Sequence, residues 1–251
     1  MSPVNGDVAA VAIETATETV GVAVRAPDGV EAELALTGRR RHVETLTPAL
    51  DHLLQQVGLG PSDLRVVAVD IGPGLFTGLR VGVAAAKGLA QALGIGVVCG
   101  TSLDVLTAAA AEAGLRGPVL ACVDARRAEV FAAVRVLGDD GETAAEPLAP
   151  ALWAPDFLAT ALGDLGPTVL YAVGDGARRY RETLERVPSV HVVSPALGFP
   201  PPSTLLRLAM VRLAQGEAPV DAESVVPLYM READAKSNFE RARGEAELES
   251  R

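Results

Sequence analysis

Two carboxylates and one glycine-rich turn are the parts of this sequence whose type and position could do chemistry. Glu14 and Asp124 each come directly after an apolar run, where a strand is expected to end. The glycine-rich turn, residues 72–78, also follows an apolar run and precedes a helix-like segment. A turn of this kind can hold phosphate groups with its backbone N–H groups. The first hypothesis is therefore a site for phosphate or nucleotide.

The glycine-rich turn matches neither of the common phosphate-binding motifs. Gly78 is followed by Leu79 and Arg80, where a P-loop requires Lys and then Ser or Thr. The dinucleotide motif Gly-x-Gly-x-x-Gly is not met either, because Gly78 comes one residue too late after Gly72 and Gly74. We therefore favour close packing as the role of these glycines.

The helix predicted from about residue 77 to 93 has one face with almost no side chains. Its small residues recur every four positions: Gly78, Gly82, Ala86 and Ala90. Each glycine inside a helix costs about 1 kcal/mol relative to alanine, which indicates that another backbone comes close to this face. Thr77 is expected to cap the N-terminus of this helix with its hydroxyl oxygen.

Glu14 and Asp124 allow two interpretations. Facing each other across a cleft, they would order a metal ion or a nucleotide. At the tips of separate hairpins, each would instead accept hydrogen bonds from backbone N–H groups of its own turn. We favour the second interpretation for Glu14, whereas Arg126 and Arg127 could hold Asp124 in a salt bridge or face a partner. Both carboxylates remain candidates for cofactor binding.

The apolar pattern predicts an α/β protein whose second half repeats the opening of the first. Three strands within residues 8–36 are followed by an amphipathic helix at 43–57 and then by alternating strands and helices. A second hairpin begins near residue 118, and each hairpin carries a carboxylate, Glu14 or Asp124, after its first strand. The pattern is typical of an internal duplication.

This duplication divides the chain into two lobes and a tail. We expect the first lobe to contain residues 1–105 and the second residues 106–234. The last helix, at about 204–215, is expected to pack back on the first lobe. Residues 235–251 are polar and charged, which predicts a frayed tail.

Composition argues against direct nucleic-acid binding and against a membrane span. The net charge is −10, and the nearest basic cluster, Arg39, Arg40 and Arg41, is short. A protein that grips nucleic acid by itself needs a basic surface to neutralise phosphates. The longest apolar stretch is interrupted by Lys87 and Gln91, which excludes a transmembrane helix there. No signal peptide or disulfide framework is recognisable, so we expect a cytoplasmic protein.

Several short motifs resemble those of one family, the TsaB (YeaZ) proteins. The motifs lie at residues 12–16, 72–80, 86–90, 101–104, 124–127 and 227–231. The resemblance implies the actin-like ATPase and sugar-kinase (ASKHA) fold, in which two hairpins clasp a nucleotide from opposite sides. It also implies a role in making N6-threonylcarbamoyladenosine at position 37 of tRNAs that read ANN codons.

TsaD, the catalytic relative of this family, differs at the place where it binds its metal. TsaD proteins carry Asn-His-Leu-Glu-x-His there, and the two histidines help to bind the metal. This chain has Ser102 and Leu106 in place of those histidines. A hydroxyl is a poor ligand for a transition metal and leucine is none. The resemblance therefore implies no metal at these positions and no catalytic activity of the chain alone.

The resemblance also implies partners. TsaD would be the obligate partner and TsaE a companion ATPase, with ATP and metal bound there and none by this chain alone. We expect a homodimer when the chain is alone, and only indirect contact with tRNA. The predicted partner surface uses both early helices, through Leu46, Leu50, Leu53, Gly78, Gly82, Ala86 and Ala90. The alternative is a free-standing ASKHA enzyme, either a small-molecule kinase or a TsaD-like transferase.

Overall fold

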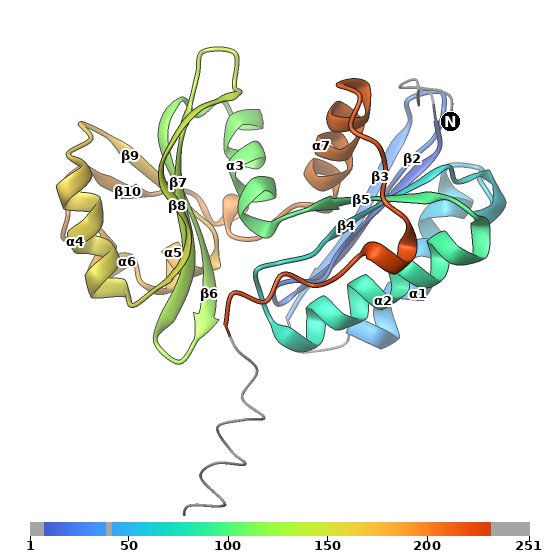
Figure 1. Cartoon of the computed structure of the whole chain (residues 1–251), viewed down its shortest axis with the longest axis horizontal. Coiled ribbons are helices and arrows are strands. Elements are labelled where there is room, and N and C mark those ends of the chain that lie inside the picture. The colour runs from blue at the N-terminus through green and yellow to red at the C-terminus, as the bar shows by residue number, and fades with distance from the viewer. Residues whose placement is uncertain (1–7, 39–41, 232–251) are drawn as a thin grey trace, which may run out of the picture.

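The computed structural model describes residues 8–38 and 42–231 of the 251-residue chain. The predicted tail at 235–251 and the cluster Arg39, Arg40 and Arg41 lie outside the described residues. Two five-stranded sheets stand side by side, each with helices packed against it (Figure 1). No helix in the described part of the chain is both long and apolar enough to cross a membrane.

The first sheet has the strand order β3-β2-β1-β4-β5. Strands β1, β2 and β3 are antiparallel neighbours, while β1, β4 and β5 run parallel. Every residue of β1 and β4 is buried, which explains why both strands read as nearly continuous apolar runs in the sequence. The strands are β1 (Ala10–Glu14), β2 (Thr19–Arg25), β3 (Glu31–Thr37), β4 (Val66–Asp70) and β5 (Gly96–Gly100).

The second sheet repeats this arrangement. Its order is β10-β9-β6-β7-β8, with β6, β7 and β8 antiparallel and β6, β9 and β10 parallel. The strands are β6 (Gly117–Arg126), β7 (Glu129–Leu137), β8 (Thr143–Trp153), β9 (Leu170–Val173) and β10 (Val190–Val192). Two sheets of one topology, each opening with a hairpin, confirm the ASKHA fold expected from the sequence.

Helices cover both faces of the sheets. The helices are α1 (His42–Gln56), α2 (Phe76–Leu93), α3 (Ser102–Glu112), α4 (Pro155–Leu165), α5 (Asp175–Arg179), α6 (Arg181–Leu184) and α7 (Pro202–Ala214). Short 3-10 turns occur at η1 (Pro61–Asp63), η2 (Pro195–Leu197) and η3 (Ala222–Ser224). Helices α1 and α2 lie on one face of the first sheet and α7 on the other, while α3 packs on β6 of the second sheet.

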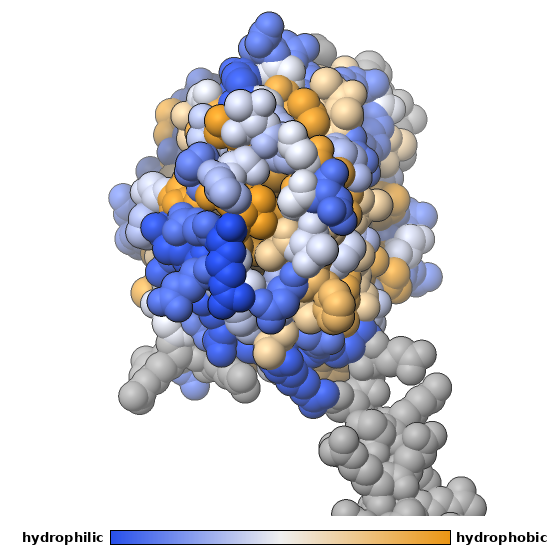
Figure 2. Space-filling model, turned by 90° about the vertical axis from the view of Figure 1, so that its left-hand side faces the viewer, coloured by the Kyte–Doolittle hydropathy of each residue, from blue (hydrophilic) through white to orange (hydrophobic). Residues whose placement is uncertain are grey.

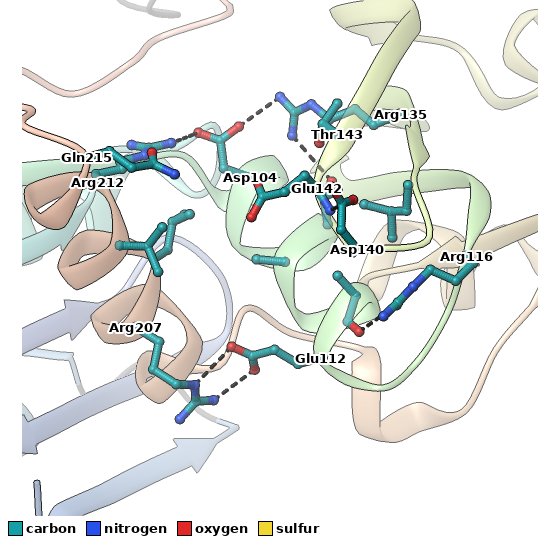
Figure 3. Close-up of a pocket in the computed structure, with 17 residues that line it drawn as sticks. Asp104, Glu112, Arg116, Arg135, Asp140, Glu142, Thr143, Arg207, Arg212 and Gln215 are labelled. Carbon is teal, nitrogen blue, oxygen red and sulfur yellow. Dashed lines mark hydrogen bonds and ion pairs between the residues drawn. The ribbon is translucent and has the colours of Figure 1, made fainter.

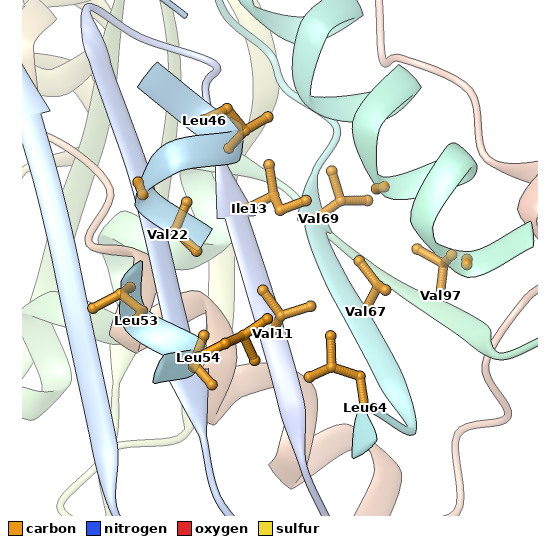
Figure 4. Close-up of a cluster of buried hydrophobic side chains, with 14 of the residues drawn as sticks. Val11, Ile13, Val22, Leu46, Leu53, Leu54, Leu64, Val67, Val69 and Val97 are labelled. Carbon is orange, nitrogen blue, oxygen red and sulfur yellow. The ribbon is translucent and has the colours of Figure 1, made fainter. Parts of the chain in front are cut away.

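The core of the first lobe follows the two-residue period of its strands. Val11 and Ile13 of β1 point toward α1 and α2, where they meet Leu46, Leu53 and other large side chains (Figure 4). The intervening alanines of β1 and β4 point to the opposite face and pack against α7. Large residues on one face and small residues on the other set how closely each helix approaches the sheet.

The chain returns to the first lobe at its end. After α7, residues 217–231 run across the first lobe to the second hairpin, and we name this segment the C-terminal strap. Val220 forms a β-bridge with Val97 of β5, and the Lys87 ammonium donates hydrogen bonds to two carbonyl oxygens of the strap. Arg231 reaches Glu129 and the Ala125 carbonyl in the second lobe. The strap therefore contacts both lobes.

Three local features differ from the sequence-based expectations. Helix α2 begins at Phe76 with Leu75 as its N-cap, so the predicted capping role of Thr77 is wrong. The Leu75 N–H donates to the Ala16 carbonyl (2.6 Å), which fixes where the chain enters the helix. The expected boundary between residues 105 and 106 falls inside α3. Strand β8 was not anticipated, because it is mostly exposed and contains two prolines.

Candidate functional site

The glycine-rich turn packs tightly onto the first hairpin. A Cβ on Gly74 would lie 2.0 Å from the carbonyl oxygen of Ala16, a distance no side chain tolerates. The Gly72 N–H donates to the Asp70 carboxylate (2.7 Å), and the Leu75 N–H donates to the Ala16 carbonyl oxygen. These N–H groups are engaged within the chain instead of pointing to a ligand, which confirms close packing as the role of Gly74.

The small-residue face of α2 packs on the chain's own first sheet. A Cβ on Gly82 would lie 2.2 Å from the Thr15 hydroxyl, and that hydroxyl donates to the Gly78 carbonyl (2.8 Å). Ala86 and Ala90 are buried in the same core. The close approach inferred from the spacing is therefore real, but its partner is β1 and the turn that follows it. The structure corrects the prediction that these four residues face another protein.

Helix α1 behaves in the same way. Leu46 and Leu53 are each only 5% exposed and belong to the core of the first lobe, and Leu50 is half-buried against it. Of these three predicted interface residues, Leu46 alone also reaches the surface groove described next.

The outward faces of α1 and α2 form an apolar groove that the sequence analysis did not single out. Its volume is about 510 Å³, and we name it the α1–α2 groove. Val43, at the start of α1, is 72% exposed, and Phe76, at the start of α2, is 41% exposed. The Arg80 guanidinium lies 3.8 Å above the Phe76 ring and donates to the Tyr229 hydroxyl. The lining is Val43, Leu46, Thr47, Phe76, Thr77, Arg80, Val81, Ala84 and Ala85.

The end of the molecule formed by the second lobe also exposes apolar side chains. Figure 2 shows the end formed by the second lobe, where apolar patches alternate with strongly hydrophilic ones. Phe157 on α4 is 74% exposed there, and Leu165 and Val169 follow at 38% and 37%. Phe157 is a useful reference for the α1–α2 groove, because it is equally prominent and lies on the opposite lobe.

In the first lobe, the candidate carboxylate Glu14 lies buried beside a second acid, Asp70. Both side chains are fully buried. The Ala16 N–H donates to Glu14 Oε1 (2.8 Å), as the local-turn interpretation predicts. Burial and the neighbouring carboxylate raise the pKa of Glu14 well above its usual value, and burial raises the pKa of Asp70. Asp70 could have been found from sequence, because it ends β4 as Glu14 ends β1.

In the second lobe, the candidate carboxylate Asp124 is held by arginines. Arg126 bonds it twice, through the backbone N–H to Oδ1 (3.0 Å) and the guanidinium to Oδ2 (2.7 Å), and Arg179 adds a bond of 3.2 Å. The Asp124 N–H donates to Asp175, whose pKa is raised by burial to about 6. The proposed salt bridge of Asp124 is thus present with Arg126.

An ion pair joins the tips of the two hairpins. The guanidinium of Arg126 reaches Glu18 in the first hairpin at 2.5 Å. Arg126, Arg127 and Ala128 all adopt positive φ angles between 54° and 65°, a left-handed conformation that is uncommon outside glycine. The Arg126–Glu18 pair thus links the two hairpins that carry Asp124 and Glu14.

Ser102 and Leu106 lie in the buried first turns of α3. Ser102 is fully buried, with its Oγ close to the Asp70 carboxylate, and Leu106 belongs to the core of the second lobe. Within residues 8–38 and 42–231, no three His, Cys, Asp or Glu side chains come together in a way that could hold a metal ion.

A second groove, of about 550 Å³, lies between α3, α7 and the β7–β8 hairpin (Figure 3). Its arginines already have partners: Arg207 bonds Glu112, Arg212 bonds Asp104, and Arg135 also bonds Asp104. The fourth arginine, Arg116, donates to the carbonyl oxygens of Asp139, Ala111 and Leu115.

Known proteins resemble this chain in sequence over both lobes. A family model described as TsaD, tRNA N6-adenosine threonylcarbamoyltransferase, matches residues 22–239. An uncharacterized protein of Mycobacterium tuberculosis is 34% identical over 90% of this chain and 92% of its own length. The tRNA threonylcarbamoyladenosine biosynthesis protein TsaB of Haemophilus influenzae is 28% identical over 88% of this chain and 92% of its own length.

The solved structure of YeaZ from Pseudomonas aeruginosa superposes with a TM-score of 0.76, at 29% identity, over 88% of this chain and 99% of that one. This chain belongs to the TsaB (YeaZ) family. Membership covers both lobes, since the matches extend over nearly the whole described region. The TsaB family assignment agrees with the motifs at the glycine-rich turn and at the start of α3.

Proposed function

We propose that this protein takes part in forming N6-threonylcarbamoyladenosine at position 37 of tRNAs that read ANN codons, as a non-catalytic partner of the TsaD transferase. The match along nearly its full length to a protein named TsaB, a tRNA threonylcarbamoyladenosine biosynthesis protein, carries this proposal. Ser102 and Leu106, in place of the metal-binding histidines of TsaD, support a role without catalysis. ATP and metal would then be bound by TsaD and TsaE, in the cytoplasm.

The α1–α2 groove supports a specific contact with TsaD. It is apolar and flanked by two helices, and its exposed Val43 and Phe76 would be covered in a complex. This proposal keeps the two helices predicted from the sequence and replaces their small-residue face by their outward face. A stable contact of this kind buries roughly 2,000 Å² or more in total. A homodimer would use the same groove and compete with TsaD.

The net charge of −10 supports a division of labour in which TsaD contacts the tRNA. Depletion of this protein should therefore remove threonylcarbamoyladenosine from tRNA while TsaD is still present. Mass spectrometry of tRNA nucleosides measures this directly. An unchanged level of the modification in depleted cells would contradict the proposed function.

Val43→Asp tests the groove. Val43 is exposed in the first turn of α1, where an acid is compatible with the helix dipole, so the variant should fold. We expect it to lose TsaD in size-exclusion chromatography and to fail to restore the modification in depleted cells. Phe157→Asp, equally exposed on the second lobe, is the matched control and should bind normally. Equal binding by both variants would move the interface elsewhere.

The competing function is a free-standing ASKHA enzyme. Calorimetric titration of the isolated protein with ATP separates the two: tight binding would favour the enzyme. The Gly72 and Leu75 N–H groups of the glycine-rich turn are already bonded within the chain and are not free to bind phosphate. This favours the role of a non-catalytic partner.

A further inference from the structure

Glu14 and Asp70 form a pair of carboxyl groups at the ends of two neighbouring parallel strands. The register of β1 and β4 pairs Ile13 with Val69, so the next residue of each strand stands beside the other. Both side chains lie on the face of the sheet that carries the small alanines, on the side of Ser102 at the start of α3. Their proximity is thus fixed by two strands, not by a loop.

Each carboxyl group uses one oxygen and leaves the other without a partner. Glu14 Oε1 accepts the Ala16 N–H, and Asp70 Oδ1 accepts the Gly72 N–H. Glu14 Oε2, Asp70 Oδ2 and the Ser102 Oγ are completely buried and find no hydrogen-bond partner among the described residues if both acids are ionised. Yet the two acids are close enough to bond each other once one carries a hydrogen.

Among the described residues, the side chains with the main effects on these two acids include no cation. The groups that act on the pair are the Ser102 hydroxyl and the acids Asp104 and Asp175. Asp104 is itself paired with Arg135 and Arg212, and its effect on the pair is repulsive. Two ionised carboxylates side by side in a closed site cost far more than one.

We infer that Glu14 and Asp70 share a single proton, which lies between Glu14 Oε2 and Asp70 Oδ2 and is supported by the Ser102 hydroxyl. One proton turns a repulsive contact into a hydrogen bond and satisfies the free oxygens. No third His, Cys, Asp or Glu among the described residues joins the two acids in a group that could hold a metal ion. The raised pKa of both acids agrees in direction with the shared proton.

The pair ties the turn after β1 to the turn after β4 and makes the stability of this junction fall as pH rises. Unfolded Asp and Glu release their protons near pH 4, whereas the folded pair retains one to a higher pH. The folded state therefore binds more protons in this range, and its stability falls as pH rises. One retained proton lowers the ratio of folded to unfolded protein about tenfold per pH unit, until the raised pKa of the pair is passed.

Glu14→Gln mimics the protonated acid and provides the test. Its amide oxygen can accept the Ala16 N–H, and its NH₂ can donate to Asp70. We expect the full-length wild type to show the infrared carbonyl band of a protonated carboxylic acid at pH 7, and Glu14→Gln to lack it. Asp175→Asn is the control and should retain the band. In urea titrations above about pH 6, where Asp175 has released its proton, Glu14→Gln should lose the tenfold-per-unit decline in folding equilibrium that the wild type shows.

Absence of the band from the wild type at pH 7 would overturn the inference, whatever the variants do. Magnesium or calcium that stabilises the wild type at pH 8, but not Glu14→Gln, would also overturn it in favour of a cation site. Should Glu14→Gln fail to fold, Asp70→Asn carries the same mimic on the other strand and is expected to lose the band.

Discussion

The two lobes share one strand order but neutralise their acids in opposite ways. In the first lobe, Glu14 bonds the N–H two residues later, on Ala16, and in the second Asp124 bonds the equivalent N–H on Arg126. The backbone geometry is therefore repeated. The side chain at that position differs, since a methyl group offers no charge whereas the guanidinium forms a salt bridge.

This difference shows that the topology determines the position of the acid but not whether a salt bridge or a proton neutralises it. The Asp124 carboxylate forms ion pairs with Arg126 and Arg179 within a bonded network. Glu14 has the neighbouring Asp70 and no arginine, and a proton is the remaining means of removing the repulsion. A duplicated fold can thus carry an ionic junction in one half and a protonated one in the other.

The largest effects are expected from two glycines, one in each lobe, that pack against a backbone carbonyl oxygen. A Cβ on Gly74 would lie 2.0 Å from Ala16 O, and one on Gly174 would lie 2.1 Å from Cys122 O. Each change to alanine should lower the free energy of unfolding by about 3 kcal/mol or more in urea titrations. Gly174→Ala should cost more, because Gly174 also has a φ of +101°.

Gly88→Ala is the control for these variants. It lies in α2 with nothing within 4 Å of an added Cβ, so alanine should stabilise the helix by about 0.5–1 kcal/mol. A harmless Gly74→Ala beside a destabilising Gly174→Ala would show that the first lobe can relieve its close contact and the second cannot.

The pH dependence of Asp175 should sharpen the comparison. Burial raises the pKa of Asp175 from 3.8 to about 6, so the folded state holds its proton more strongly than the unfolded state. Stability from this group is therefore lost as pH rises from about 4 to about 6, by about 2–3 kcal/mol, and then levels off. Asp175→Asn should reduce the total decline between about pH 4 and about pH 6 by this amount and leave the part that comes from the Glu14–Asp70 pair. A decline of the same size in the variant would exclude Asp175 as its source.

Removal of the arginine partner should cost less. Arg126→Met removes one guanidinium from Asp124, which keeps its pair with Arg179, and also breaks the pair with Glu18. Because the Arg126 side chain is 33% exposed, we expect a loss of about 1–2 kcal/mol by thermal melting, smaller at high salt. Arg186→Met removes the mostly exposed pair of Arg186 with Asp156 and should change the free energy of unfolding by less than about 0.5 kcal/mol. Equal losses of stability in Arg126→Met and Arg186→Met would show that the Arg126–Asp124 pair stabilises the fold no more than an exposed surface pair does.

The smallest effect concerns the C-terminal strap on the first lobe. Lys87→Met removes two hydrogen bonds to strap carbonyls and should cost about 0.5–1 kcal/mol. Hydrogen exchange of the Val220 N–H, bonded to Val97 O at 2.8 Å, should accelerate in this variant. Lys87→Arg keeps a donor and is the control. Unchanged exchange in Lys87→Met would mean that the β-bridge holds the strap without the lysine.

The sequence predicted well what depends on local pattern. The buried runs of β1 and β4 and the carboxylates at the hairpins are visible in it, because parallel strands covered on both faces are apolar throughout. The close approach at Gly82 was also predictable from its spacing, but the identity of the neighbour was not. Thr15 is 67 positions away in the chain, and its hydroxyl meets Gly82 through tertiary folding alone.

The features that were missed depend on exposure. Val43 and Phe76 do not differ in sequence from core residues, and their outward direction follows from how α1 and α2 lie on the sheet. Strand β8 is exposed along most of its length and contains prolines, so its apolar alternation is weak. The partner of Glu14 is Asp70, and only strand pairing brings the two ends together.

The return of the chain to the first lobe has a consequence for how the protein emerges from the ribosome. The last strand of the first sheet ends at Gly100, but the helix that covers one of its faces begins at Pro202. Until that helix is synthesised, the alanine face of β1 and β4 has no cover from Leu205, Leu206 and Met210. The first lobe is therefore translated first and completed last, and the second lobe can acquire its whole core while the first still waits on the nascent chain.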